Sequence, residues 1–190
     1  IKKIKDEFLL MLKENLDSCI QPVYSKTRRS FDTYDSLKKR CTAKVTELAE
    51  EYRTIEHNLQ ALREVRNEID YYLRRYHNYA IKENIGAHYV EVGLEGNGIF
   101  EHMIPASTVR DCVIAGKISV EQALNVPTCR LSKESDNLLR EKGWANNTPD
   151  AYNFWLRYSY CFDSVFKTHD GHPVDTKMNL DDHYRLFKFI

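Results

Sequence analysis

The feature that most constrains this chain is a stretch without glycine or proline that covers residues 23–85. These two residues most often interrupt a helix or mark a turn, so their absence over 63 residues predicts a long helix. Apolar residues within the stretch recur every seven positions in two columns. The columns are Cys41, Leu48, Ile55, Leu62, Ile69 and Tyr76, and Val45, Tyr52, Leu59, Arg66, Leu73 and Ala80. They match the a and d positions of a heptad repeat, which predicts a left-handed coiled coil.

The heptad stripe formed by these two columns needs something to cover it. A continuous helix over residues 31–85 would be about 80 Å long. A domain made of residues 86–190 would be about 30 Å across and would cover less than half of that rod. We therefore expect a partner helix, either residues 1–20, which are amphipathic themselves, or a second copy of the chain. The residues expected to mediate self-association are Leu48, Ile55, Leu59, Leu62, Ile69 and Leu73. An ordinary long helix lying on its own globular domain is the alternative.

The composition of the chain changes at Gly86, because six of the seven glycines lie between Gly86 and Gly143. We place a domain boundary there, between residues 1–85 and residues 86–190. In the second half, strands are expected at 88–92, 99–104 and 126–131, with a turn at 95–98 that makes the first two a hairpin. Helices are expected at 107–115, 119–124, 132–142, 149–160 and 180–189. The predicted fold class is α+β, with a long N-terminal coiled coil followed by a small β-hairpin-plus-helices domain.

The segment with the most chemical content is Glu101-His102-Met103-Ile104-Pro105, at the end of the returning strand. A carboxylate next to a histidine suits phosphodiester hydrolysis, in which a metal ion neutralises phosphate charge and a base deprotonates water. Adjacent residues of a strand point to opposite faces of a sheet. A distorted strand end is therefore needed if both side chains are to serve one site.

This motif resembles the first motif of the HNH branch of the His-Me finger nucleases, which reads acidic-His-x-x-Pro. The resemblance covers about residues 88–142, with Asn125 opening a strand and Glu134 nine residues further on. It implies a β-hairpin and a helix around one divalent metal such as Mg²⁺, with His102 as the general base. Asn125 would brace the loop that carries this histidine.

The same resemblance implies a set of metal ligands. Glu101 and Glu134 would hold the ion, with Asp136 as the substitute ligand, since carboxylates suit hard cations. The chain departs from the family pattern in three places. Glu134 stands where His or Asn is more usual, residues 106–124 form a long interval, and the paired Cys-x-x-Cys motifs common in the family are absent.

Charge limits what the chain can bind. Lys and Arg number 28, as do Asp and Glu, so the chain has no overall basic coat for nucleic acid. Residues 86–190 hold 11 basic and 14 acidic residues, which disfavours DNA binding unless the N-terminal arm supplies the phosphate contacts. The candidate contacts are Lys38, Lys39 and Arg40. A solvated helix face is the alternative interpretation.

Two further segments have open interpretations. The cluster around His169-Asp170-Gly171-His172 suits either a transition metal or simple turns. The aromatic residues of 152–162 suit either base stacking or core packing. The five cysteines are odd in number and include no Cys-x-x-Cys pair, which predicts reduced thiols and a cytoplasmic protein. No apolar run is long enough to span a membrane.

Two functions from different classes are consistent with these features. One is a metal-dependent HNH-type endonuclease, oligomerised by its coiled coil, that cuts DNA with water activated by His102. The other is a non-catalytic assembly protein, such as a phage or phage-satellite scaffold acting in the host cytoplasm. In that protein the nuclease-like domain is kept as a folded unit, and the coiled coil binds itself or another protein. The Glu101–His102 pair favours the first, whereas the acidic second half and Glu134 favour the second.

Overall fold

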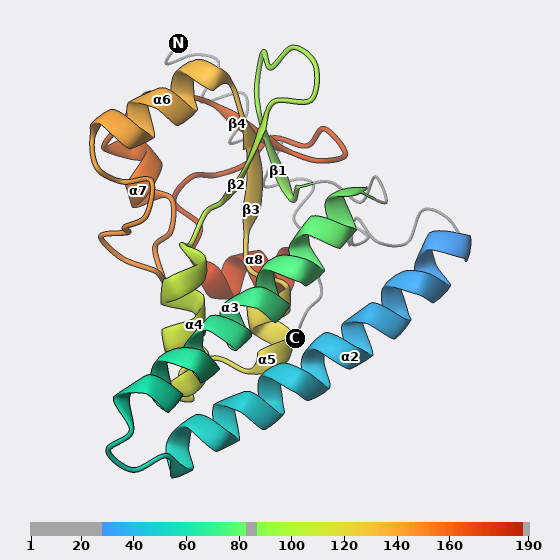
Figure 1. Cartoon of the computed structure of the whole chain (residues 1–190). Helices are drawn as coiled ribbons and strands as arrows, with labels where there is room; N and C mark the ends of the chain where they lie inside the picture. The colour runs from blue at the N-terminus through green and yellow to red at the C-terminus, as the bar shows by residue number, and fades with distance from the viewer. Residues whose placement is uncertain (1–27, 83–86, 188–190) are drawn as a thin grey trace. The chain divides into compact units, whose positions relative to one another are not determined.

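The computed structural model describes residues 28–82 and 87–187 (Figure 1). The helix expected over residues 1–20 lies outside these ranges. Within them the chain is mixed α+β, with seven helices and one four-stranded sheet, as the sequence predicts at this level. The chain divides into two compact units.

The first, which we call the helical unit, contains four helices. They are α2 (Arg28–Thr54), α3 (Leu59–Lys82), α4 (Ala106–Ile114) and α5 (Val120–Leu124). The second, the sheet unit, contains β1 (Tyr89–Glu91), β2 (Ile99–His102), β3 (Thr128–Leu131), β4 (Phe166–Thr168), α6 (Lys133–Glu141), α7 (Leu156–Ser159) and α8 (Leu180–Leu186). We expected one domain after Gly86, but residues 106–126 group with the helical unit.

The prediction of one continuous helix over residues 31–85 is wrong. The helix stops at Thr54 and a new one starts at Leu59, so α2 and α3 form a helical hairpin and lie side by side (Figure 1). No glycine is needed for the turn, because His57 adopts the left-handed conformation at φ 57°. The Asn58 side-chain oxygen then accepts from the Ala61 N–H at 3.1 Å and caps the start of α3.

The hairpin gives the heptad stripe a cover within its own unit. Its buried members come from both helices, and they are Cys41, Val45, Leu48, Ile69, Leu73 and Tyr76. Ile55 and Leu62 are partly exposed, whereas Leu59, in the first turn of α3, is 81% exposed. Helices α4 and α5 also contact the hairpin. The argument that the stripe needs a partner helix therefore fails, because it assumed an unbroken rod.

Ion pairs tie the short helices of this unit to the hairpin. Arg110, almost buried, pairs with Asp70, and Arg66 pairs with Asp111 at 3.0 Å. On α5 the Ser119 hydroxyl accepts from the Gln122 N–H at 3.1 Å and completes a capping box. Both short helices lie where the sequence predicts them, to within one residue at each end.

The sheet has the strand order β2-β3-β1-β4. The strands at 88–92 and 99–104 are both present, but they do not form the expected hairpin. Instead β3 lies between them, parallel to β1 and antiparallel to β2. Residues 93–98 form only the connection between β1 and β2, with Gly98 at φ 58°. A Cβ at Gly98 would lie 2.7 Å from the Leu131 carbonyl oxygen, so this position requires glycine.

Aromatic side chains make up much of the sheet unit's core. The Tyr89 ring packs edge-on against Trp155 at 5.1 Å, and Trp155 packs against Phe166 at 4.9 Å. Phe166 belongs to β4, a strand that the sequence analysis assigns to a loop. The helix expected over 149–160 is reduced to α7, with turns before it. Helix α8 begins as expected, with Asn179 as its cap.

Candidate functional site

The predicted Glu101–His102 pair lies at the end of β2, but its two side chains do not converge. Pairing with β3 is regular to the last residue, with Glu101 opposite Cys129 and His102 opposite Thr128. Neighbouring side chains of such a strand point to opposite faces. The His102 ring accordingly lies 5.2 Å from the ring of Phe100, two positions earlier. The distorted strand end that a shared site requires is not present.

The side chain that meets Glu101 is Arg157 of α7. Its guanidinium is fully buried and forms an ion pair with the Glu101 carboxylate. The same group donates to the carbonyl oxygens of His102 at 2.6 Å, Trp144 at 2.7 Å and Ala145 at 2.8 Å. Arg157 thus satisfies its donors with one carboxylate and a ring of backbone carbonyls. It fixes the end of β2 to the segment that precedes α7.

The carboxylates expected to bind metal have other partners. Burial raises the pKa of Glu101, the charge of Arg157 opposes this, and the nearby charge of Asp136 raises it further. Asp136 is itself nearly buried and pairs with Arg140 one turn later at 2.8 Å. Glu134 is exposed in the first turn of α6. Within residues 28–82 and 87–187, no three His, Cys, Asp or Glu side chains are placed to hold a metal ion.

Asn125 belongs to the helical unit, whereas Glu101, His102, Glu134 and Asp136 belong to the sheet unit. It is buried directly after α5, and its amide donates to the Glu121 carbonyl oxygen at 2.8 Å. Asn125 is therefore the C-terminal cap of α5. The role implied by the resemblance, which is to brace the loop that carries His102, stays a prediction.

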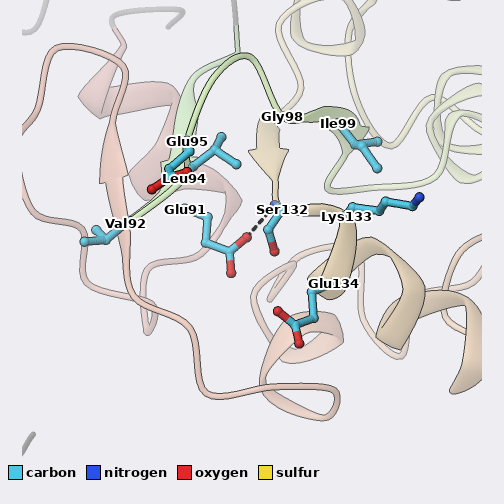
Figure 2. Close-up of a pocket in the computed structure, with 10 residues that line it drawn as sticks. Glu91, Val92, Leu94, Glu95, Gly98, Ile99, Ser132, Lys133 and Glu134 are labelled. Carbon is cyan, nitrogen blue, oxygen red and sulfur yellow. Dashed lines mark hydrogen bonds between the residues drawn. The ribbon is translucent and has the colours of Figure 1, made fainter.

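A cavity of about 530 Å³ lies where the β1–β2 connection meets the start of α6. Its walls include Val92, Leu94 and Ile99, and its polar groups include Glu91 and Glu134 (Figure 2). The sequence analysis did not select Glu91, because a single acidic residue in a strand carries no pattern.

Glu91 is nearly buried and holds the start of α6 in place. Its carboxylate accepts from the Ser132 N–H at 2.7 Å (Figure 2), the Ser135 hydroxyl at 2.6 Å and the Ser164 hydroxyl at 2.7 Å. Burial alone would raise the pKa of Glu91, but these hydrogen bonds outweigh it and hold the pKa below its usual value. Because the Glu91 carboxylate already accepts three hydrogen bonds, its role is to stabilise the fold around the cavity.

The predicted basic stretch divides between two faces of α2. Lys38 forms an ion pair with Glu121 of α5, inside the helical unit. Lys39 and Arg40 are exposed. Two of the three candidate phosphate contacts are thus accessible, and the third joins two helices.

The aromatic residues of 152–162 also divide. Phe154, Trp155 and Tyr158 are buried, which supports the core-packing interpretation for these three. Tyr152 and Tyr160 are 45% and 58% exposed. The His169–His172 segment forms a tight connection after β4, in which the Thr168 hydroxyl donates to Asp170 at 2.5 Å. This contact fits the turn interpretation of that segment.

Arg157 is the residue of this region that the sequence analysis missed. An arginine inside an otherwise aromatic run was the available signal, since such a charge must find a partner when the run is buried. The four cysteines in the described part of the chain are free thiols. No helix there is long and apolar enough to cross a membrane.

Comparison of this chain with protein-family models, with curated proteins and with solved structures finds no match.

Proposed function

We propose that this chain is a non-catalytic assembly protein that retains a nuclease-like strand–strand–helix element. The observation that carries this proposal is the buried Arg157 guanidinium against Glu101. A divalent cation bound by Glu101 would lie next to a fixed positive charge that has no access to water. The repulsion at such short range disfavours the cation.

Two further observations support the same conclusion. His102 and Glu101 point to opposite faces of β2, so a base at one cannot act on water held at the other. Asp136 is engaged by Arg140. In this proposal, the polar side chains of the element serve to hold the fold together.

The assembly role is supported by three exposed large side chains in one segment of the sheet unit, Tyr152, Leu156 and Tyr160. They are 37–58% exposed, the Tyr152 hydroxyl donates to Asp181 at 2.7 Å, and the Tyr160 ring lies 6.1 Å from that of Trp144. We assign this exposed segment to contact with a second copy of the chain. The formal net charge of zero means that two copies do not repel each other at long range.

Sedimentation velocity over a range of concentrations tests the assembly role. The unmodified chain should associate, and Leu156→Asp should shift it to monomer. Leu59→Asp is the matched control, because Leu59 is equally apolar and more exposed but lies on the helical unit. A monomeric unmodified chain at high concentration, or dissociation by Leu59→Asp alone, would contradict the proposal.

An HNH-type endonuclease is the second candidate. The element order of β2, β3 and α6, with antiparallel strands before the helix, favours it, as does the position of Glu101 within electrostatic range of Asp136. Its test is nicking of supercoiled plasmid with Mg²⁺, with and without a chelator. Nicking that requires Mg²⁺ and is abolished by His102→Ala would establish the enzyme and overturn the non-catalytic proposal. Our proposal expects no Mg²⁺-dependent nicking by either protein.

A further inference from the structure

Tyr71 is an exposed aromatic residue held in a defined position on α3. It lies two residues from both Ile69 and Leu73, which are buried, so it points away from the core of the helical unit. Its ring packs edge-on against Tyr72, with centroids 5.2 Å apart, and its hydroxyl accepts from Arg75 Nη1 at 2.9 Å. The Arg75 guanidinium also lies 5.8 Å from the ring centroid. Even so, 54% of Tyr71 is exposed.

Exposed basic side chains lie on both helices of the hairpin. Arg74 and Arg75 are both exposed on α3, and Lys39 and Arg40 are exposed on α2. Burial raises the pKa of the Cys41 thiol, and the charges of Arg75 and Arg40 partly offset that effect. Both guanidinium groups therefore act on the same thiol electrostatically, although they come from different helices.

These cations are not neutralised by neighbours. No ion pair between described residues involves Lys39, Arg40, Arg74 or Arg75, which leaves their charge available to a ligand. The negative charges of the adjacent acidic residues are partly neutralised by Lys44. This lysine pairs with Glu47 at 2.7 Å and also interacts electrostatically with Glu68.

We propose that this arginine–tyrosine patch, formed by Lys39, Arg40, Tyr71, Arg74 and Arg75, binds single-stranded nucleic acid. Its arginines match the phosphates of a flexible backbone, and the exposed Tyr71 ring supplies a surface on which an unpaired base stacks. The proposal is independent of the non-catalytic assembly role and goes beyond it.

The combination of features selects this ligand over an acidic protein segment. Cations alone would bind any polyanion. The Tyr71 ring, which contacts Arg75 and Tyr72, adds a flat surface on which a planar base can stack. Duplex DNA keeps its bases stacked internally, so it would use only the cations. Dependence on Tyr71 therefore distinguishes a single strand from the other polyanions.

The first experiment measures the contribution of charge. Binding of a fluorescein-labelled twelve-residue oligothymidylate is followed by anisotropy at several salt concentrations. Arg75→Glu should weaken binding about ten-fold at low salt and lower the salt dependence, because a phosphate contact is lost. Arg63→Glu makes the same charge change on an exposed residue of α3 outside the patch, and it should have less than a two-fold effect. Equal effects of the two variants would overturn the proposal.

The second experiment measures the contribution of stacking. Tyr71→Ala should weaken binding about ten-fold, whereas Tyr71→Phe should stay within two-fold of the unmodified protein. An abasic oligonucleotide of the same length should bind the unmodified protein and Tyr71→Ala equally. If polyglutamate competes as well as the oligothymidylate, or if Tyr71→Ala has no effect, the ligand is a general polyanion and the proposal is wrong. Far-UV circular dichroism of each variant confirms that the hairpin is intact.

Discussion

The helical unit and the sheet unit build their cores in different ways. In the helical unit a repeat places an apolar residue at nearly every core position, and its members Val45, Leu48 and Leu73 are buried. In the sheet unit the end of a strand is fixed by Arg157, and the start of a helix by Glu91. Removing the buried ion should therefore cost the sheet unit more than removing one apolar side chain costs the helical unit.

The largest expected effect is at the centre of the sheet unit. Arg157→Met leaves the Glu101 carboxylate and several backbone carbonyls without their donor. We expect the sheet unit to lose about 4 kcal/mol of unfolding free energy. Both tryptophans, Trp144 and Trp155, lie in this unit, so urea unfolding followed by tryptophan fluorescence reports on it alone.

Arg140→Ala is the control for this change, because Arg140 also pairs with a carboxylate but is largely exposed. It should cost less than about 1 kcal/mol. A similar cost for both variants would show that the sheet unit does not depend on its buried charge.

The next effect tests the helical unit. Leu73→Ala removes a fully buried side chain and should cost about 3 kcal/mol of unfolding free energy, measured by circular dichroism at 222 nm. Leu59→Ala changes the same kind of residue at another heptad position, but Leu59 is exposed, so its cost should stay below about 0.5 kcal/mol. Equal losses of unfolding free energy in the two variants would mean that the heptad stripe is buried along its whole length. That result would contradict a turn between the two helices at Ile55–Asn58.

The two units should also respond differently to acid. Burial lowers the pKa of His77, on α3, to about 4, and its ring bonds the Leu124 carbonyl oxygen at 3.1 Å. The unfolded chain takes up a proton near pH 6.5, and the folded chain does so only near pH 4. The helical unit should therefore lose up to about 3 kcal/mol as the pH falls across this interval.

The pKa of the Glu91 carboxyl in the sheet unit is also lowered, but the effect on stability is opposite, because the fold favours the charged carboxylate. Its pKa is held below the ordinary value of 4.5, so its contribution persists down to about pH 4.5 and is lost as the pH falls further. Unfolding measured by circular dichroism at pH 7, 5.5 and 4.5 checks the difference. His77→Gln should remove the pH dependence of the helical unit, whereas His57→Gln, at an exposed position, should leave it unchanged.

The smallest effect concerns the start of α6. The Ser132 hydroxyl accepts from the Ser135 N–H at 3.1 Å, so Ser132→Ala should cost the sheet unit about 1 kcal/mol. Ser159→Ala, at the end of α7, should have almost no effect on tryptophan-monitored unfolding. A cost at Ser132 that approaches that of Arg157→Met would mean that the cap, and not the buried ion, fixes this unit.

Local signals allow correct prediction of many elements. The helices that follow Ser119, Ser132 and Asn179 are predicted close to their observed starts, because each cap is a contact within a few residues of chain. The turn at Ile55–Asn58 is not predictable in this way, because it depends on His57 in the left-handed conformation, which histidine seldom adopts. The position of β3 between β1 and β2 is equally hidden, because strand order depends on contacts far apart in the sequence.

The candidate site shows the same limit. The Glu101–His102 motif is readable in the sequence, and its position at the end of β2 is as expected. Its chemistry depends on Arg157, 56 residues beyond Glu101, and nothing local links the two. The proposed single-strand patch likewise joins Arg40 and Arg75 through a hairpin that the heptad pattern conceals.

The two units are interleaved along the chain. The sheet unit contains β1 and β2, then the chain leaves it for Ala106–Val126, and it returns with β3. A fragment cut at Gly86 would strip α4 and α5 from the hairpin, so neither half can be excised intact. During synthesis, the hairpin can contact α5 only after Val120–Leu124 has been made. The central strands β1 and β3 can pair only after the segment between them has been made. Isolating either unit therefore needs a circularly permuted gene or a designed linker that replaces the excised segment.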